Sequence, residues 1–239
     1  MKQKRIVMTG GTGRFAKIFK KIKKKEKIYF PTKKTLNLKN FNSIKKYIKR
    51  IKPDYLIHCA ALSRPMDIHE KNIDESITTN IIGTSNIVRI CNQEKIKLIY
   101  FSTNYVYPGV KGNYKEEDPV LPINKYALSK FGGECAVQMY DNSLILRICM
   151  TEKPFIHKKA FNDVETNFMY HNEFAKNLLK LIDLKGILNV GGPTMIVYDF
   201  AKQTNKKVLP VSSKKILGKQ FPKKQSMNVK KYFKIIQKN

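Results

Sequence analysis

The chain has 239 residues, 42% of them hydrophobic, and its 47 lysine and arginine residues against 18 acidic residues give a net charge of +29. This length is enough for one large domain, or for one domain and a small lobe. The longest apolar runs have the length of strands and fall far short of the roughly 18 residues of a membrane helix. Residues 1–5 lead into an apolar run too short for a signal peptide. We therefore expect a cytoplasmic protein without a membrane span.

Composition also bears on partners and on metals. Lysine accounts for 41 of the 47 basic residues and occurs in nearly every segment, whereas arginine, which binds bases and phosphates in a bidentate manner, is scarce. We therefore expect anionic small molecules such as nucleotides as partners, and not nucleic acid. The four cysteines lie far apart without a Cys-x-x-Cys pair, so we expect neither a metal site nor disulfides: Cys59, Cys91, Cys135 and Cys149.

A glycine turn between a strand and a helix opens the chain. The apolar run at residues 5–9 ends at Gly10-Gly-Thr-Gly13, and apolar residues at helical spacing follow over residues 14–22. Gly10 and Gly13 permit a tight turn and a close backbone approach, and the helix N-terminus offers free N–H groups to a pyrophosphate. This arrangement predicts a dinucleotide site.

The second expected strand, residues 27–30, is followed by basic residues instead of an acid. Proteins that bind NAD often carry Asp or Glu at this point to bind the ribose hydroxyls. Here Arg14, Lys33 and Lys34 could meet a 2′-phosphate, so the sequence favours NADP(H) over NAD(H). In a chain so rich in lysine, the same residues could also reflect composition alone.

Helices and apolar strands continue to alternate up to about residue 150. We expect helices at residues 41–51 (capped by Asn40) and 75–93, and strands at 55–60, 97–101 and 144–147. Near-continuous apolar strands are typical of a parallel sheet covered on both faces. His58 lies inside such a strand, which favours a packed core histidine over a catalytic one. The strand at 97–101 delivers Ser102-Thr-Asn104 at its carboxyl end, where open α/β sheets bind ligands.

The pattern predicts an α/β fold, a doubly wound (Rossmann) parallel sheet. We expect an NADP-binding domain at residues 1–150 and a small C-terminal substrate-binding lobe at 151–239, with a strand at 186–190 that returns to the sheet. A helix at 173–182 and an amphipathic end at 232–236 are the other elements expected in the lobe. The loop at residues 105–123 is too long for a simple connection, so we expect it to be functional.

Tyr126 and Lys130 stand four residues apart in the helix expected after this loop. On a helix they would lie on one face. A cation beside a phenol favours its ionised form, which makes the pair suitable for proton transfer in carbonyl and alcohol chemistry. The spacing alone is also common by chance in a chain rich in lysine, where it would mark a solvated helix face.

Five motifs in one order give the chain a family resemblance. They are Thr9-Gly-Gly-Thr-Gly-Arg-Phe-Ala16, His58-Cys-Ala-Ala61, Asn80-Ile-Ile-Gly-Thr84, Ser102-Thr-Asn-Tyr-Val106 and Tyr126-x-x-x-Lys130. Together they resemble the extended short-chain dehydrogenase/reductases. The segments at 53–61 and 102–109 are most similar to the dTDP-4-dehydrorhamnose reductase branch. The resemblance covers residues 4–150 and is thinner afterwards.

The resemblance implies that NADPH reduces the C4 carbonyl of a nucleotide-linked 4-keto-6-deoxysugar, in a protein that could be a homodimer. Tyr126 would donate the proton, Lys130 would lower the pKa of the phenol and bind the nicotinamide ribose, and Thr103 would polarise the carbonyl. The implied cofactor contacts are Gly10, Thr12, Gly13, Arg14, Phe15, Lys33, Asn37, Leu38, Cys59, Ala60, Ala61, Asn80, Tyr126 and Lys130, with Asn80 supporting the lysine. The implied substrate contacts are Ser63, Asn104, Tyr105 and Met150.

Departures from the family pattern keep other functions open. Asn104 and Asn37 stand where the family usually has Asp, Ile148-Cys-Met150 replaces Thr-Ser-Trp, and the sugar-binding half is short. One alternative is a non-catalytic NADP-binding regulatory protein like the beta subunit of methionine adenosyltransferase, which belongs to the same branch. A nucleotide-sugar epimerase that uses NAD is less favoured, since no acid follows the second strand. No Asp-Glu pair follows Thr103, which argues against a sugar 4,6-dehydratase.

Overall fold

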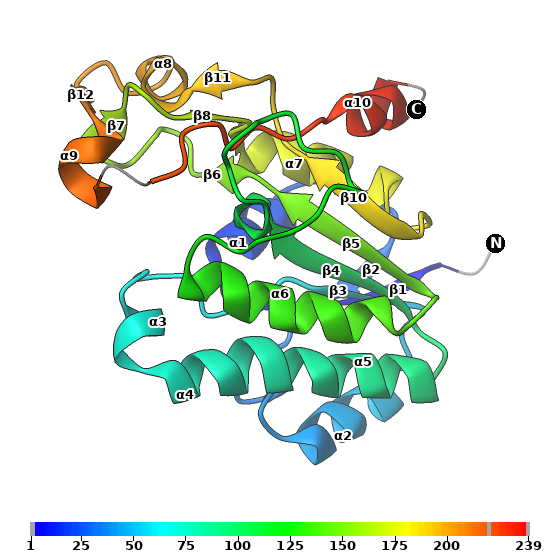
Figure 1. Cartoon of the computed structure of the whole chain (residues 1–239). Coiled ribbons are helices and arrows are strands. Elements are labelled where there is room, and N and C mark those ends of the chain that lie inside the picture. Colours follow the sequence, from blue (N-terminus) through cyan, green and yellow to red (C-terminus); the bar gives the residue numbers. More distant parts are fainter. Residues whose placement is uncertain (1–2, 219–220, 238–239) are drawn as a thin grey trace. The chain divides into compact units, whose positions relative to one another are not determined.

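A computed structural model describes residues 3–218 and 221–237 of the chain, which forms two compact units. The first unit comprises Met1–Ser102, Asn124–Leu146 and Leu181–Ile187, and the second comprises Thr103–Ile123, Arg147–Lys180 and Leu188–Asn239. Figure 1 labels the helices and strands along the chain.

A six-stranded parallel sheet is the framework of the fold, in the order β10-β5-β4-β3-β1-β2. Its strands are β1 (Arg5–Thr9), β2 (Lys27–Tyr29), β3 (Tyr55–His58), β4 (Lys97–Thr103), β5 (Ser143–Ile148) and β10 (Gly186–Val190). In the parallel register Val7 pairs with Leu56, and Leu56 pairs with Leu98. The strand order reverses between β1 and β3, which is where doubly wound sheets open a crevice for ligands. The predicted fold class is thus confirmed.

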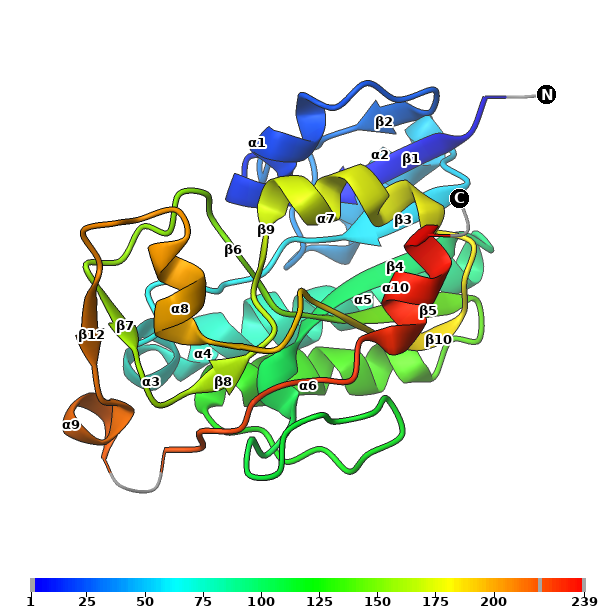
Figure 2. The ribbon, with the colours of Figure 1, turned by 90° about the horizontal axis from the view of Figure 1, so that it is seen from above.

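Helices cover both faces of the sheet within the first unit. Figures 1 and 2 show α2 (Phe41–Ile51), α5 (Gly83–Gln93) and α6 (Lys125–Gln138) on one face and α1 (Arg14–Lys20) on the other. Neighbouring side chains of β4 point to these opposite faces, because successive residues of a strand alternate. Tyr100 donates a hydrogen bond of 2.8 Å from its hydroxyl to the Lys130 carbonyl oxygen in α6. The Phe101 ring instead packs edge-on against Phe15 of α1 at 5.4 Å.

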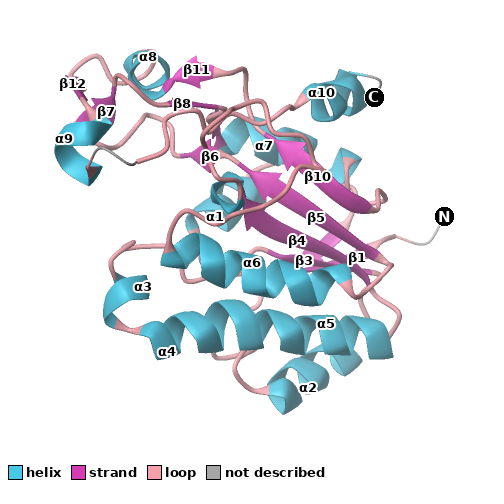
Figure 3. Cartoon of the chain, in the orientation of Figure 1, coloured by secondary structure: helices cyan, strands magenta, loops and turns pink. Residues whose placement is uncertain are grey.

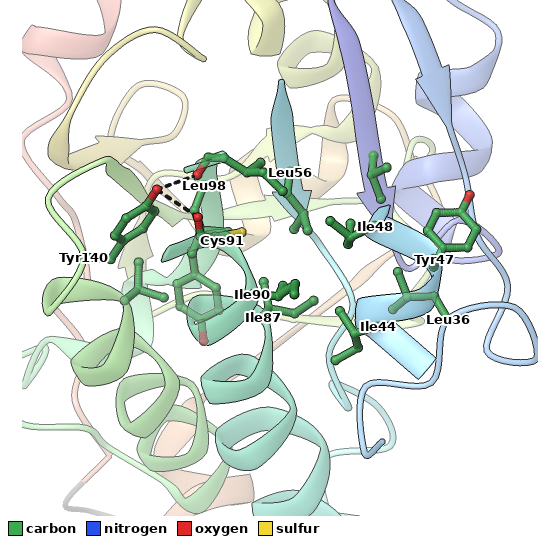
Figure 4. Close-up of a cluster of buried hydrophobic side chains, with 14 of the residues drawn as sticks. Leu36, Ile44, Tyr47, Ile48, Leu56, Ile87, Ile90, Cys91, Leu98 and Tyr140 are labelled. Carbon is green, nitrogen blue, oxygen red and sulfur yellow. Dashed lines mark hydrogen bonds between the residues drawn. The ribbon is translucent and has the colours of Figure 1, made fainter. Parts of the chain in front are cut away.

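The core of the first unit lies between the sheet and the helices α2 and α5 (Figure 4). Its fully buried members include Leu56 and Leu98 from the strands, Ile44 from α2, and Ile87 and Ile90 from α5. Burying each of these side chains contributes roughly 1.5–3 kcal/mol of transfer free energy. The apolar residues of this layer produced the periodic pattern from which the alternating helices and strands were predicted.

The helix expected at residues 75–93 begins two residues earlier and contains a π-helical turn, and Figure 3 shows it as one long helix. It runs through α4 (Ile73–Ser76), a π-helical turn η1 (Ile77–Ile82) and α5, and Asn72 caps its start by accepting a hydrogen bond from the Glu75 N–H. A short helix α3 (Ile68–Lys71) precedes it. A π-helical turn often marks a functional position, and Asn80 lies within this one.

The second unit is built from short elements around an apolar cluster that includes Phe155, Tyr170 and Phe200. Three two-stranded sheets pair β6 (Met150–Thr151) with β9 (Met169–Tyr170), β7 (Lys159–Phe161) with β12 (Leu209–Val211), and β8 (Glu165–Thr166) with β11 (Met195–Ile196). Besides a 3-10 turn at Asn104–Val106, the helices of its described residues are α7 (His171–Asn177), η3 (Leu178–Lys180), α8 (Val197–Lys202), α9 (Ser213–Leu217) and α10 (Lys230–Gln237). The helix expected at 173–182 therefore begins earlier and ends in a 3-10 turn, and the amphipathic end lies in α10. The strands of these two-stranded sheets are only two or three residues long. They are too short to show the alternation of apolar and polar residues from which a strand can be predicted.

The expected functional loop at 105–123 is ordered by contacts within the second unit. It begins with the 3-10 turn η2 (Asn104–Val106). Tyr107 stacks on Tyr114 with ring centroids 4.9 Å apart and donates a 2.9 Å hydrogen bond to Asn189 Oδ1. Asn189 Nδ2 in turn donates to the Tyr114 carbonyl oxygen at 2.9 Å.

Among the described residues, no helix is both long and apolar enough to cross a membrane.

Candidate active site

The glycine turn after β1 packs directly against the end of β3. Gly10 has a φ of +72°, and a Cβ placed on it would lie 2.9 Å from the backbone nitrogen of Ala60. The Gly13 N–H closes the turn with a 2.8 Å hydrogen bond to the Gly10 carbonyl oxygen. Gly13 also caps α1 and, as a glycine, offers no side chain to bond the first N–H groups of that helix. A backbone this bare fits a dinucleotide pyrophosphate.

The other residues expected at the cofactor surround this turn in different ways. Thr12 and Arg14 are exposed, whereas the Phe15 side chain is buried against Phe101, which leaves its backbone as the group it can offer. Lys33 is exposed in the segment after β2. Leu38 packs against the start of α5, where a Cβ on Gly83 would lie 3.0 Å from its own Cβ.

Two more of the expected residues shape the segment between β2 and α2. Asn37 accepts a 3.1 Å hydrogen bond from the Lys39 N–H on its side-chain oxygen, and its own N–H donates to Ser43 Oγ at 3.1 Å. The Leu38 carbonyl oxygen accepts a 3.0 Å hydrogen bond from Asn86 Nδ2 in α5. The side chain at position 37 thus serves the local turn, where the family pattern has an acid.

Asn80 ties the segment after β3 to α6. Its side chain is almost completely buried. It accepts a 2.8 Å hydrogen bond from the Leu62 N–H and donates at 2.9 Å to the Leu62 carbonyl oxygen. It also donates at 2.8 Å to Ser129 Oγ, and Ser129 donates at 2.7 Å to the Tyr126 carbonyl oxygen. The π-helical turn therefore connects the Cys59–Ser63 segment with the helix that carries Tyr126 and Lys130.

Lys130 is 2% exposed and lies beneath the face of Tyr100, with 4.1 Å between its Nζ and the ring centroid. Burial lowers the pKa of its ammonium to about 7, although Cys59 and Glu134 act in the opposite direction. Asn124 caps α6 by accepting a 2.8 Å hydrogen bond from the Ala127 N–H. The helix thereby presents Tyr126, which is half-buried, one turn before the lysine.

Two residues around this pair, Glu134 and His69, had no signal in the sequence. Glu134 is fully buried one turn after Lys130 and accepts a 2.6 Å hydrogen bond from Ser102 Oγ. The His69 ring lies 5.2 Å from the Tyr126 ring, centroid to centroid. Its Nδ1 is 2.7 Å from Ser76 Oγ, and its Nε2 is buried without a hydrogen-bond partner among the described residues. The Ser102–Glu134 and His69–Tyr126 contacts join residues far apart in the chain, which hides them from any local pattern.

The residues expected at the substrate fall in both units. Ser63 is half-buried in the first unit, one residue after the Leu62 backbone that Asn80 holds. In the second unit, Thr103 ends β4, is almost completely buried, and accepts a 3.3 Å hydrogen bond from the Tyr105 N–H. Asn104 is 5% exposed, and its Nδ2 has no hydrogen-bond partner among residues 3–218 and 221–237. Met150 is half-buried in β6.

Comparison with known proteins places this site in a family context. The family model described as "RmlD substrate binding domain" matches residues 4–190. The methionine adenosyltransferase 2 subunit beta of Xenopus laevis is 30% identical over 155 residues, which is 61% of this chain and 46% of that protein. The dTDP-4-dehydrorhamnose reductase of Aggregatibacter actinomycetemcomitans is 29% identical over 166 residues, 66% of this chain and 51% of that protein. The chain thus spans about half the length of these curated relatives.

Solved structures share the fold along nearly the whole chain. The dTDP-4-dehydrorhamnose reductase of Bacillus anthracis, in complex with NADP, matches with a TM-score of 0.86 and 25% identity, covering 97% of this chain and 92% of that chain. The enzyme WbmG of Bordetella bronchiseptica, in complex with NAD, matches with a TM-score of 0.75 and 16% identity, covering 99% of this chain and 88% of that chain. The second match bears on the fold alone.

Proposed function

Because the chain belongs to the RmlD substrate-binding domain family, we propose that it is an NAD(P)-dependent oxidoreductase. Its substrate is a nucleotide-linked 4-keto-6-deoxysugar, and its product serves the biosynthesis of a deoxysugar such as rhamnose. The observation that carries the proposal is the buried Lys130 one turn after Tyr126, joined through Ser129 and Asn80 to the segment that follows β3. A solvated helix face would require no such burial.

The residues of the first unit supply the proton chemistry. A bound nicotinamide supplies the hydride. Tyr126 donates its hydroxyl proton to the oxygen of the reduced carbonyl, and Lys130 stabilises the phenolate that remains. Thr103, at the carboxyl end of β4, donates a hydrogen bond to the carbonyl oxygen and polarises it. Because burial brings the pKa of Lys130 to about 7, small changes around its amine alter how much of it is charged near neutral pH.

NADP(H) is the cofactor favoured by the surface charges. The segment after β2 contains the exposed Lys33 and Lys34, and Arg14 begins α1 in an exposed position. Cationic side chains here attract a 2′-phosphate, while an acid that would bind the free ribose hydroxyls is missing from residues 30–35. The solved relative that binds NADP supports this choice, and another relative with the same fold binds NAD.

The sugar nucleotide is recognised by residues at the carboxyl ends of the strands. Asn104 offers a buried amide nitrogen with no partner among the described residues. An unpaired buried donor lowers the stability of the fold by about 1–3 kcal/mol. A hydrogen bond from this amide to an acceptor atom of the substrate would remove that cost. Ser63, Tyr105 and Met150 complete the proposed substrate contacts. Asn104 and Met150 differ from the family pattern, so the proposal names the class of substrate and not a particular nucleotide or sugar.

A second candidate is a regulatory subunit that binds NADP without turnover. It is favoured by the identity of 30% with methionine adenosyltransferase 2 subunit beta over 61% of this chain. The two functions differ in one measurement, NADPH consumption in the presence of dTDP- and UDP-linked 4-keto-6-deoxysugars. We expect turnover by the wild-type protein, and its loss with retained NADPH affinity in Tyr126→Phe. Tight NADPH binding without turnover of any of these sugars would reject the enzyme and favour the regulator.

A further inference from the structure

A buried histidine that the proposed chemistry does not use lies at the end of β3. His58 is 0% exposed, and both of its ring nitrogens are hydrogen-bonded. Its Nδ1 is 2.8 Å from Thr9 Oγ1 at the end of β1, and its Nε2 is 3.0 Å from Thr84 Oγ1 in α5. All three residues belong to the first unit. The histidine thus bridges the strand that leads into the glycine turn and the helix that follows the π-helical turn.

The neighbours of His58 fix the direction of every hydrogen bond in this bridge. Thr84 Oγ1 lies 2.7 Å from the Asn80 carbonyl oxygen, which can only accept. The Thr84 side chain also contacts the Tyr100 hydroxyl, whose own proton goes to the Lys130 carbonyl oxygen, so with either acceptor the threonine proton points away from His58. His58 Nε2 must therefore donate to Thr84. A neutral imidazole then accepts at Nδ1, from the Thr9 hydroxyl. Thr9 Oγ1 itself accepts a 3.2 Å hydrogen bond from the Ala60 N–H. The result is one unidirectional series of four hydrogen bonds from the Ala60 N–H to the Asn80 carbonyl.

A charged imidazole would break this series. It would carry a proton on Nδ1, and the Thr9 hydroxyl proton would lose its acceptor. Burial lowers the pKa of His58 to about 3, and the positive charge of Lys130 acts in the same direction. The other titratable groups beside it are the Tyr100 ring, 5.7 Å away between centroids, and the thiol of the adjacent Cys59. Neither supplies a negative charge, because burial raises the pKa of both groups.

The two ends of the series reach the two halves of the proposed site. At one end, Ala60 is the residue against which Gly10 packs, with 2.9 Å between its nitrogen and a Cβ placed on the glycine. At the other end, Asn80 holds Leu62 and Ser129 through its side chain. At Gly133, α6 approaches so closely that a Cβ would lie 2.7 Å from the Asn80 carbonyl oxygen. A shift of this carbonyl would therefore displace α6.

We propose that His58 is a positioning residue, held as the neutral Nε2–H tautomer. Its Nδ1 keeps Ala60 against the glycine turn that binds the cofactor, and its Nε2–H keeps Asn80 against the helix that carries Tyr126 and Lys130. It takes no part in proton transfer with the substrate. The role of Nε2–H in placing the catalytic helix rests on the proposed function, whereas the role of Nδ1 at the glycine turn requires only that the protein binds the cofactor.

Two substitutions test the cofactor contact and the catalytic contact of His58 separately. Each one replaces a single ring nitrogen with an amide group of the same hydrogen-bonding type. His58→Asn places an acceptor near the position of Nδ1 but cannot reach Thr84. We expect its NADPH affinity to stay within about twofold, while kcat falls on the order of tenfold or more because α6 is misplaced. His58→Gln places a donor near Nε2 and loses the acceptor for Thr9. We expect NADPH affinity to fall on the order of tenfold, with kcat at saturating NADPH largely retained.

Matched controls distinguish positioning from general packing. Thr84→Val removes the hydroxyl at nearly constant shape, and we expect it to lower kcat as His58→Asn does, without a further loss in the double variant. The same His→Asn exchange at the exposed His157 should change neither parameter. Equal losses of affinity and kcat in His58→Asn and His58→Gln would overturn the proposal in favour of packing, and full activity of His58→Asn would overturn it outright.

A spectroscopic measurement tests the tautomer without any turnover. We expect the nitrogen NMR shifts of the His58 ring in the wild-type protein to report a neutral Nε2–H imidazole throughout about pH 5–8. An Nδ1–H tautomer or an imidazolium in this range would contradict the proposal. If no sugar nucleotide is reduced, so that the proposed function fails, the NMR shifts and the NADPH affinity of His58→Gln still decide the cofactor half.

Discussion

Tyr100 holds Lys130 at both ends: its hydroxyl donates a 2.8 Å hydrogen bond to the lysine's carbonyl oxygen, and its ring centroid lies 4.1 Å from the lysine's Nζ. One side chain of β4 thus fixes both the backbone and the amine of the same residue in α6. The ring face stabilises a cation that burial otherwise disfavours. This relationship gives Lys130 a defined place even without a ligand, and several predictions depend on it.

The two contacts of Tyr100 can be separated by substitution. Tyr100→Phe removes the hydroxyl and leaves the Lys130 carbonyl oxygen without that donor, while the ring remains over the amine. We expect it to lower the free energy of unfolding by about 1–2 kcal/mol. Tyr100→Leu also removes the ring and should cost more, since it leaves a cavity. Urea denaturation of both variants measures the difference, and equal stability of Tyr100→Phe and the wild type would contradict the role of the hydroxyl.

The lowered pKa of Lys130 predicts how stability depends on pH. In the unfolded chain its ammonium titrates near 10.4, whereas in the folded protein its pKa is about 7. Between these values the unfolded state binds more protons, so this lysine makes the folded protein more stable as the pH rises from about 7 towards 10. Lys130→Met abolishes the effect. We expect the variant's advantage over the wild type to be largest below about pH 7 and to shrink as the pH rises.

Thermal unfolding of the two proteins without NADPH, at a series of pH values, measures this difference. Glu134→Gln serves as a second test, because Glu134 raises the pKa of Lys130. Without that carboxylate the pH window should begin at a lower pH. An advantage of Lys130→Met that grows with pH would show that the ammonium is stabilised in the fold.

The close packing of Gly10 can be tested with Gly186 as a control. Both glycines have a left-handed backbone, but only Gly186 has free space around it. Gly10 and Gly186 both have a positive φ, of 72° and 81°. A Cβ on Gly10 would meet the Ala60 backbone at 2.9 Å, whereas a Cβ on Gly186 would meet nothing within 4 Å. We expect Gly186→Ala to cost about 1–2 kcal/mol of stability through backbone strain and to leave NADPH affinity unchanged. Gly10→Ala should cost more and weaken NADPH binding strongly, as measured by fluorescence titration.

Asn104 is predicted to contribute to substrate binding more than to stability. Its Nδ2 makes no hydrogen bond within the described part of the chain, so Asn104→Ala removes an unpaired buried donor and should not lower the free energy of unfolding by more than about 1 kcal/mol. If the amide binds the sugar nucleotide, kcat/KM should fall about 10- to 100-fold, which corresponds to losing a buried hydrogen bond. NADPH affinity should not change. Unchanged kcat/KM would remove Asn104 from the substrate site.

The cofactor preference is predicted to depend on the two lysines after β2. Lys33→Ala combined with Lys34→Ala should weaken NADPH binding on the order of tenfold and leave NADH binding unchanged, since only NADPH carries the 2′-phosphate. Lys23→Ala, at another exposed lysine, controls for the loss of general positive charge. The affinity for both cofactors, measured at one fixed salt concentration, decides the question. Parallel losses for NADH and NADPH would assign the lysines a nonspecific role.

The sequence by itself determined the features that depend on neighbouring residues. The glycine turn at residue 10, the helical spacing of Tyr126 and Lys130, and the buried strands all follow from local periodicity and backbone freedom. The strand expected at 55–60 is an example, of which residues 55–58 form β3. Each strand needs apolar residues on both faces and each helix needs an apolar stripe. The alternation of helices and strands could therefore be predicted without knowledge of tertiary contacts. His58 was also correctly expected to be a core residue, because it interrupts an apolar strand.

Only the tertiary structure decided which polar groups meet. The hydrogen bond between Asn80 and Ser129 and the one between Thr9 and His58 each join residues 49 positions apart. Glu134 and Ser102 are 32 positions apart. Such pairs leave no period in a single sequence, and the free energy that selects them comes from satisfying buried donors and acceptors once the sheet has formed. The same reason explains why Tyr126 and Lys130 could be located by spacing, while the groups that hold Lys130 in place could not.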